Sequence, residues 1–231
     1  MRRAGCWTKG LIVLIALIVL LVAADFIAKA VAQGEVASQI QKQGFPKKPS
    51  VSIEGFPFLT QVASRDFQQI KLSSSNIPEG PVKISRVSAT MTGIHLTGGF
   101  TKGVIDQLNG SILITFGSLG KTLNSQIGPL GSLVGDSGLK LSAAGSDEIK
   151  ASLDLLVASG SATWKITRPN GQEVQAQLVS SSGVPSDLLG SLRSFTVKIP
   201  KLPYNVKIDS VHITPEGIVG RISGHDLPFG S

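Results

Sequence analysis

The stretch that decides the fold is Val51-Ser-Ile-Glu-Gly-Phe-Pro-Phe-Leu-Thr-Gln-Val62. It begins with the alternation of a strand, because Val51 and Ile53 share one face and polar side chains occupy the other. Gly55 interrupts the alternation, and Pro57 then fixes its own φ and keeps the preceding residue extended. The Phe-Pro-Phe-Leu segment has no group that takes a proton or binds a metal. Its chemistry is therefore apolar contact, either with the protein's own core or with an apolar ligand.

Composition and charge narrow the class of protein. The 231 residues are enough for one large domain or two small ones beside a targeting segment. Apolar residues make up 42% of the chain and charged residues only 16%, which is low for a soluble surface. Arg2, Arg3 and Lys9 supply +3 of the net charge of +7. The rest of the chain therefore has a net charge of only 7 − 3 = +4, and it has no basic stripe interleaved with aromatic residues. Such a mild positive charge favours an anionic membrane surface over nucleic acid as the partner.

The N-terminus carries an uninterrupted aliphatic run, Leu11–Ala24. A bilayer span needs about 20 residues, which the run reaches only if it continues past Asp25 through Phe26 and Ile27. The cations before it predict that the N-terminus stays inside and that the rest of the chain lies outside. The single cysteine, Cys6, precedes the run, whereas the cysteine of a lipoprotein would follow it.

Two interpretations of residues 1–32 remain open. They form an uncleaved transmembrane anchor, or they are a signal peptide that ends at the small residues Ala30-Val31-Ala32. Residues 33–50 are expected to form a helical stalk or linker, and residues 51–231 the main domain. In either case the main domain is predicted to lie in the cell envelope, on the periplasmic side of the cytoplasmic membrane, either anchored or released.

Past the stalk, apolar and polar residues alternate in short segments, as in strands that are buried on one face. Breaks at Asn76–Pro81, Gly98–Gly99 and Arg168–Gly171 predict turns between them. Helices are expected at Ser118–Ile127, with Ser118 as the N-cap, and at Pro185–Leu192. Many antiparallel strands with interposed helices define the class α+β. Strands are expected at Val51–Glu54, Arg65–Ser75, Val82–Leu96, Gly110–Phe116, Leu139–Ala143, Ile149–Val157, Ser161–Thr167, Val174–Leu178, Phe195–Ile199, Val206–Ile213 and Ile218–Ile222.

Three patterns that suggest catalysis do not hold. Thr115–Thr122 lies between a predicted strand and a helix, but Thr115 stands where a phosphate-binding loop requires its first glycine. A Ser-x-x-Lys match beginning at Ser118 lacks the Lys-Thr-Gly and Ser-Asp-Asn motifs that accompany it in penicillin-recognising enzymes. His95 and His212 are expected at the surface, opposite apolar strand faces, and no histidines have the spacing of metal ligands. The sequence predicts no enzyme activity, no metal and no cofactor.

Three sequence motifs together resemble those of a known family. Ile53-Glu-Gly-Phe-Pro-Phe-Leu-Thr-Gln-Val62 resembles the signature of the LmeA-like phospholipid-binding family of actinobacteria. Leu202-Pro-Tyr-Asn-Val206 and Val211-His-Ile-Thr-Pro-Glu-Gly-Ile218 are similar to its C-terminal signature. The order also matches, with an N-terminal apolar segment, Asp25 at its end and then a stalk before Phe-Pro-Phe. The resemblance covers nearly the whole chain.

The resemblance implies a protein of the cell envelope that binds phospholipids such as phosphatidylinositol species. The founding mycobacterial member of the family supports mannan elongation on lipomannan. The implied fold is similar to the tubular lipid-binding domains of bactericidal permeability-increasing protein, in which a long, strongly curved antiparallel sheet is rolled around helices and leaves an apolar groove. The family brings no catalytic residues to carry over.

We therefore predict an envelope phospholipid-binding protein, with lipid transfer and lipoglycan assembly as further roles that the resemblance implies. The alternative is a non-catalytic scaffold with a filled core, whose partner is an envelope enzyme. The expected partners are phospholipid and membrane, not nucleic acid. The side chains expected to line the apolar groove are Phe56, Phe58, Leu59, Phe67, Ile112, Ile114, Phe116, Leu119, Leu123, Ile127, Leu188, Leu189, Leu192 and Phe195.

Overall fold

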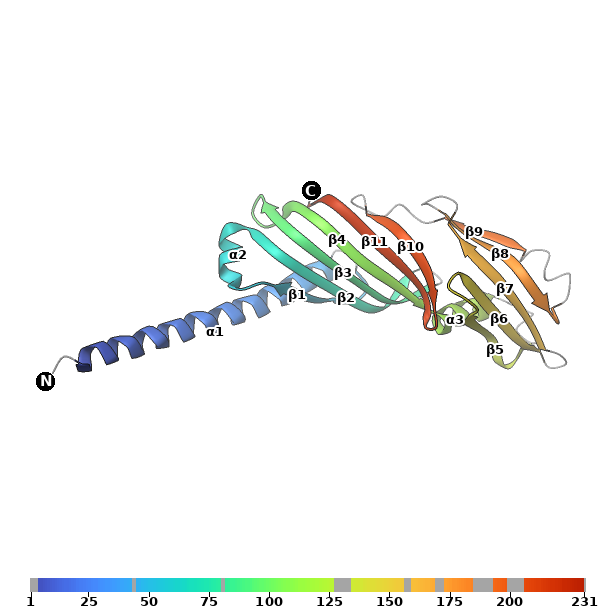
Figure 1. The fold of residues 1–231 in the computed structure, drawn as a ribbon, viewed down its shortest axis with the longest axis horizontal. Helices are drawn as coiled ribbons and strands as arrows, with labels where there is room; N and C mark the ends of the chain where they lie inside the picture. Colours follow the sequence, from blue (N-terminus) through green and yellow to red (C-terminus); the bar gives the residue numbers. More distant parts are fainter. Residues whose placement is uncertain are drawn as a thin grey trace. The chain divides into compact units, whose positions relative to one another are not determined.

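The computed structural model describes residues 4–42, 45–79, 82–126, 134–155, 159–168, 173–184, 193–198 and 206–230. A long N-terminal helix is followed by antiparallel strands with two shorter helices between them (Figure 1). The α+β class predicted from the sequence is therefore confirmed. The elements are α1 (Ala4–Lys42), β1 (Ser50–Glu54), α2 (Phe58–Ser64), β2 (Asp66–Glu79), β3 (Val82–Thr97), β4 (Lys102–Thr115), α3 (Phe116–Gln126), β5 (Val134–Ala143), β6 (Glu148–Leu155), β7 (Ser159–Thr167), β8 (Glu173–Ser182), β9 (Ser194–Lys198), β10 (Lys207–Thr214) and β11 (Gly217–Phe229).

The strands form two sheets rather than the single long sheet expected. The first has six strands in the order β1-β2-β3-β4-β11-β10, and the second has five in the order β5-β6-β7-β8-β9. Both orders are linear, so the described strands make open sheets with two edges each and not a closed barrel. The chain divides into two compact units, which we call unit 1 (residues 1–72, 90–106 and 228–231) and unit 2 (residues 73–89 and 107–227).

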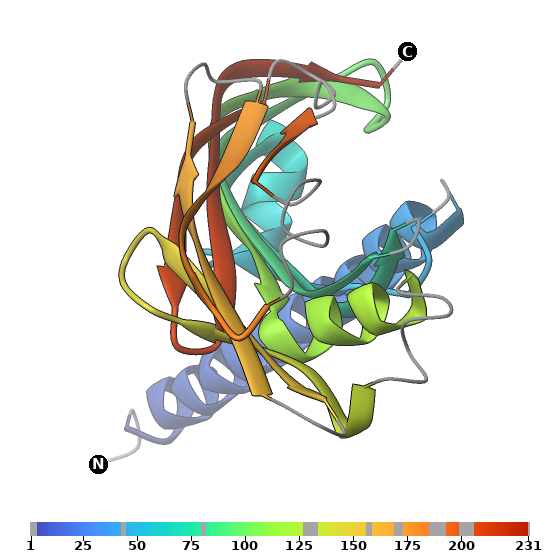
Figure 2. The same cartoon turned by 90° about the vertical axis from the view of Figure 1, so that its right-hand side faces the viewer.

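Helix α1 is unbroken from Ala4 to Lys42 (Figures 1 and 2). Its aliphatic half is exposed all round, with Leu11 and Leu20 more than half accessible. Among the described residues, this helix alone is long and apolar enough to cross a membrane by length and composition. The expected stalk helix is thus the direct continuation of the expected membrane segment, and no break separates the two.

The second half of α1 packs into the core of unit 1. Small and branched apolar residues recur along one side of the helix, at the spacing that places them above one another. Alanines in this row let the helix approach the strands closely, and Ala37 is only 3% exposed. The row consists of Ala28, Ala32, Val36, Ala37 and Ile40, and it packs with Val51, Ile53, Phe58, Phe67 and Ile94.

Unit 1 contains a helix that the sequence did not predict. The Phe56–Pro57 peptide is cis, and α2 begins directly after it. It ends at Arg65, a residue with φ of 61° whose N–H donates to the carbonyls of Gln61 and Val62. A left-handed residue at this place is a common way to stop a helix. The first strand of the opening stretch is confirmed as β1, but the residues after Pro57 are helical.

In unit 2 several expected boundaries move. Phe116 does not end a strand but begins α3, where it is 6% exposed. Ser118 is not an N-cap, because it lies inside α3 and its hydroxyl donates to the carbonyl of Lys83 at 2.7 Å. The turn expected from residue 76 is shorter, since β2 continues to Glu79. Lys121 of α3 is exposed, two residues after the half-buried Leu119. Two further expectations lie outside the described residues. They are the hairpin turn at 168–171, of which only Arg168 is described, and the helix at 185–192.

A surface histidine joins three strands of unit 1. His95 on β3 contacts Asp66 on β2 through Nδ1 at 2.8 Å, and Asp106 on β4 through Nε2 at 3.2 Å. The sequence placed His95 at the surface correctly, but gave no sign of these two carboxylates, which are 29 and 11 residues away. These two hydrogen bonds raise the pKa of His95 above its ordinary value, and the bond to Asp66 has the larger effect.

This cluster predicts a pH dependence of stability. A raised pKa in the folded state means that the protonated imidazole stabilises the fold, fully so below the ordinary histidine pKa of about 6.5. The contribution is lost as pH rises through the raised pKa. His95→Gln should therefore lower the melting temperature at pH 5.5 and make little difference at pH 9, in melts of the whole protein in detergent. An equal difference at both pH values would contradict a role for the charged form.

Candidate functional site

The register of β10 and β11 places aliphatic residues together on one face of the first sheet. Ile208 pairs with Ile222, Val211 with Gly220, and Ile213 with Ile218. Residues that pair across neighbouring strands point to the same side, so all the aliphatic members of these pairs share one face. The polar residues His212 and Arg221 are exposed and alternate with them.

Strand β4 extends this face within unit 2. A Cβ added at Gly110 would come within 2.9 Å of Ile222 Cγ1, so Gly110 lies on the side to which Ile222 points. Ile112 and Ile114 follow two and four residues later and therefore share that side. We call the half-buried aliphatic residues of this face, apart from Ile218, the aliphatic strip, and it consists of Ile112, Ile114, Ile208, Val211 and Ile222.

Among the described residues, one end of this face packs into a core cluster and the strip does not. Ile213 and Ile218 pack with Phe116 and Ile149 in a second core cluster, together with Leu141, Ala143 and Ile166 of the five-stranded sheet. Within the part of the chain that the structure describes, the strip residues belong to neither core cluster and stay partly accessible. Arg168, at the end of β7, donates from Nη2 to the carbonyl of Ile208 at 2.7 Å. A guanidinium thus lies at the edge of an accessible apolar surface.

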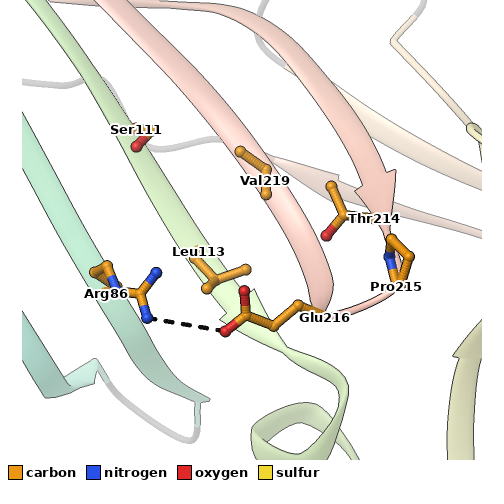
Figure 3. A pocket seen from close by; sticks show the side chains of 7 residues that line it. All are labelled: Arg86, Ser111, Leu113, Thr214, Pro215, Glu216 and Val219. Atoms are coloured by element: carbon orange, nitrogen blue, oxygen red, sulfur yellow. Dashed lines mark ion pairs between the residues drawn. The ribbon is translucent and has the colours of Figure 1, made fainter.

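The opposite face of the same strands carries a small pocket of about 370 Å³ (Figure 3). Arg86 and Glu216 lie at its rim, 3.9 Å apart, and Leu113 is buried in its wall. Ser111 and Thr214 add hydroxyl groups, and Pro215 and Val219 complete the lining. An acyl chain needs a continuous apolar surface, which this mixed lining does not provide. The strip is therefore the better candidate for apolar binding.

The groove residues predicted in unit 1 have different environments. Phe58 and Phe67 are 4% and 8% exposed, and their rings lie 6.1 Å apart in the core. Phe56, two residues earlier, is 58% exposed and stacks on Phe26 of α1 with ring centroids 6.1 Å apart. Leu59 is 42% exposed. The first two are thus core residues and the other two are surface residues.

The groove residues predicted in unit 2 also differ. Ile112 and Ile114 lie in the aliphatic strip, whereas Phe116 is buried in the second core cluster. Leu119, on α3, is half-buried. The described side chains do not include those of Leu123, Ile127, Leu188, Leu189, Leu192 and Phe195.

The sequence analysis named Asp25 only as the end of the apolar run and missed its role in organising unit 1. Asp25 of α1 is 4% exposed, and its carboxylate accepts the N–H of Phe58 at 2.9 Å and the N–H of Leu59 at 2.7 Å. These are orphan donors at the start of α2, and Pro57 before them offers no side-chain cap. The only available sequence signal was an acid at the end of an apolar run, where an unpartnered charge is costly.

Among the described residues, no group of three or more His, Cys, Asp or Glu side chains has an arrangement that could hold a metal ion. What the arrangement offers chemically is an accessible aliphatic strip, a guanidinium at its edge and an apolar helix on the same chain. Acyl chains suit the first, and a guanidinium binds phosphate oxygens well. This combination has the chemistry of a protein that binds amphipathic molecules.

The comparisons with known proteins identify the class more closely. Residues 23–223 match the family described as LmeA-like phospholipid-binding, and the protein belongs to this family. The match confirms the family resemblance found in the sequence. It begins just before Asp25 and runs through both units.

The curated relatives are mycobacterial. An uncharacterized protein of Mycobacterium bovis is 27% identical over 179 residues, which is 74% of this chain and 50% of the relative. Uncharacterized proteins from two strains of Mycobacterium tuberculosis match with the same identity and coverage. The chain thus spans half the length of the curated relatives that it matches. No solved structure matches the chain significantly.

Proposed function

We propose that the protein binds a phospholipid with its acyl chains against the aliphatic strip and its phosphate beside Arg168. Membership of a phospholipid-binding family supports the ligand class. The observation that carries the location is that five aliphatic side chains share one face of β4, β11 and β10 and join neither of the core clusters that the described residues form. Leaving them accessible in water costs about 25 cal/mol per Å² of apolar surface, and a bound acyl chain would remove that cost.

We also propose that residues 1–32 stay attached and hold the protein on the outer face of the cytoplasmic membrane. Cleavage after Ala32 would remove Asp25 and with it both hydrogen bonds at the start of α2. It would also remove Ala28 and Ala32 from the core of unit 1. An anchored protein of this kind would take lipid from the membrane beside it. Lipid transfer, a tubular arrangement of the sheets and a role in lipoglycan assembly rest on the family resemblance and stay predictions.

A substitution in the strip tests the lipid site. Ile222→Gln would place an amide against the acyl chains, and burying an unpaired amide costs about 1–3 kcal/mol. We expect phospholipid binding to weaken roughly 5- to 150-fold. The measurement is native mass spectrometry of the whole protein in detergent, titrated with phosphatidylinositol and, for comparison, with diacylglycerol, which lacks the phosphate.

The matched control is Arg221→Gln, the same new residue one position earlier on β11 and on the opposite face. It should bind lipid as the unchanged protein does. Equal weakening by both substitutions, with unchanged melting temperatures, would exclude the strip. If the unchanged protein binds neither lipid, the scaffold alternative is favoured instead. Equal affinity for both lipids would show that the phosphate, and hence Arg168, contributes nothing.

A further inference from the structure

Three apolar side chains form an exposed patch in unit 1, which we call the corner patch. It consists of Phe26 on α1 and of Phe56 and Leu59 at the start of α2, and these residues are 57%, 58% and 42% exposed. They come from two segments about 30 residues apart in the sequence. Ile27 and Val31 of α1 are exposed as well. Large apolar groups gathered in this way mark an interaction surface rather than isolated exposed residues.

The corner patch is held rigidly and does not owe its exposure to a loose loop. Asp25, next to Phe26, binds the backbone N–H groups of Phe58 and Leu59. Phe56 stacks on Phe26 with an angle of 27° between the rings. Phe58 points the other way into the core, where it is 4% exposed. The same short segment therefore buries Phe58 in the core and exposes Phe56 on the surface.

This inference rests on the proposed retention of residues 1–32 as a membrane anchor, because the apolar length of that anchor would place the patch at the membrane surface. The run Leu11–Ala24 has 14 residues, which span about 21 Å at 1.5 Å per residue. The hydrocarbon core of a bilayer is about 30 Å thick. Lys9 stands just before the run, so the apolar residues that lengthen it lie beyond Asp25, at Phe26 and Ile27. The residues of α1 that meet the outer boundary of the hydrocarbon are therefore those that carry the corner patch.

The hydrogen bonds of Asp25 favour the same depth. A carboxylate close to hydrocarbon is costly unless it has partners. Here two backbone N–H groups at 2.9 Å and 2.7 Å already satisfy it. Because the partners belong to α2, the start of that helix must accompany Asp25 to the membrane boundary, and Phe56 and Leu59 go with it.

We propose that Phe26, Phe56 and Leu59 enter the interfacial layer of the phospholipid membrane that α1 crosses, as a second contact beside the span itself. Aromatic side chains are enriched at this depth, where the apolar ring meets the head-group layer. A single helix leaves the attached domain free to rotate and tilt, whereas a second contact fixes which side of unit 1 faces the lipid. The occupant is the surface of the same membrane, reached through continuity with the apolar segment of α1.

An environment-sensitive probe tests this contact. Cys6 is the only cysteine, so Cys6→Ser provides a background for single labels. Phe56→Cys is labelled with a nitrobenzoxadiazole dye, and the whole protein is placed in vesicles of phosphatidylcholine and phosphatidylglycerol. The control is Gln41→Cys, an exposed position on α1 that lies 16 residues beyond Asp25, about 24 Å further along the helix.

We expect blue-shifted emission at position 56 and several-fold stronger quenching by phosphatidylcholine spin-labelled near the head group than at position 41. Equal, weak quenching at both positions would overturn the proposal. Leu59→Cys, labelled in the same way, must give the same result as position 56, and a melting curve for each protein shows whether it is folded. The outcome is independent of the aliphatic strip, because Ile222→Gln in the same background should leave the quenching unchanged.

Discussion

Replacing Phe58 by alanine is expected to destabilise unit 1 by about 3–5 kcal/mol, the usual loss for a buried phenylalanine. The ring is 4% exposed and lies 6.1 Å from the ring of Phe67. Ala37 of α1 and Ile53 of β1 belong to the same cluster, so a cavity there would loosen the contact between helix and sheet. Chemical denaturation of the whole protein in detergent, followed by circular dichroism, measures the loss.

Phe56→Ala makes the same chemical change two residues earlier and serves as the control. Its ring is 58% exposed, so the expected loss is below about 1 kcal/mol. In vesicles, by contrast, Phe56→Ala should weaken the contact of the corner patch with the interfacial layer of the membrane. Equal losses in detergent would contradict the assignment of one ring to the core and the other to the surface. The sequence treated both rings as lining one groove, but their exposures separate them.

Asp25→Ala is expected to cost about 3–6 kcal/mol, because it removes two hydrogen bonds and each hydrogen bond to a charged acceptor contributes about 1.5–3 kcal/mol. The variant leaves the N–H groups of Phe58 and Leu59 without their acceptor, so α2 should lose its attachment to α1. Denaturation in detergent measures this loss, and proteolysis near the cis Phe56–Pro57 bond should become faster.

Asp25→Asn is the matched control for this prediction. The amide keeps one oxygen and can accept one of the two N–H groups, so roughly half of the loss is expected. Equal stability of the alanine variant and the unchanged protein would contradict the capping role.

The retention of residues 1–32 has its own test, which is the intact mass of the protein purified from membranes. A mass that begins at Gln33 would overturn it.

Local patterns in the sequence determined much of this protein. Alternation predicted β1, β3, β7, β8 and β10, because a strand buried on one face repeats every two residues. The same rule placed Ile112 and Ile114 on one side of β4. The aliphatic run predicted the apolar half of α1. The Phe-Pro-Phe motif and the C-terminal signature indicated the phospholipid-binding family, which the comparisons confirm.

Boundaries were less predictable where a residue far along the chain decides them. Phe116 continues the alternation of β4, yet it turns into α3 and packs against Ile149 and Ile213. Asn76 has the composition of a turn but continues β2 with φ of 57°. At Phe116, packing with residues distant in the sequence overrides a local preference that is worth only a fraction of a kcal/mol per residue. At Asn76, which is exposed, asparagine tolerates the left-handed conformation that lets the strand continue.

The sequence by itself thus determined the apolar helix, most strands, the α+β class and the family. Only the tertiary structure decided that Asp25 caps a helix 33 residues later, that Phe58 is core while Phe56 is surface, and which isoleucines of β4, β10 and β11 share a face. The physical reason is the range of the interactions. Periodicity reflects neighbours within a few residues, whereas a cap, a ring stack and a strand register depend on partners that only the folded chain brings within 3 to 6 Å.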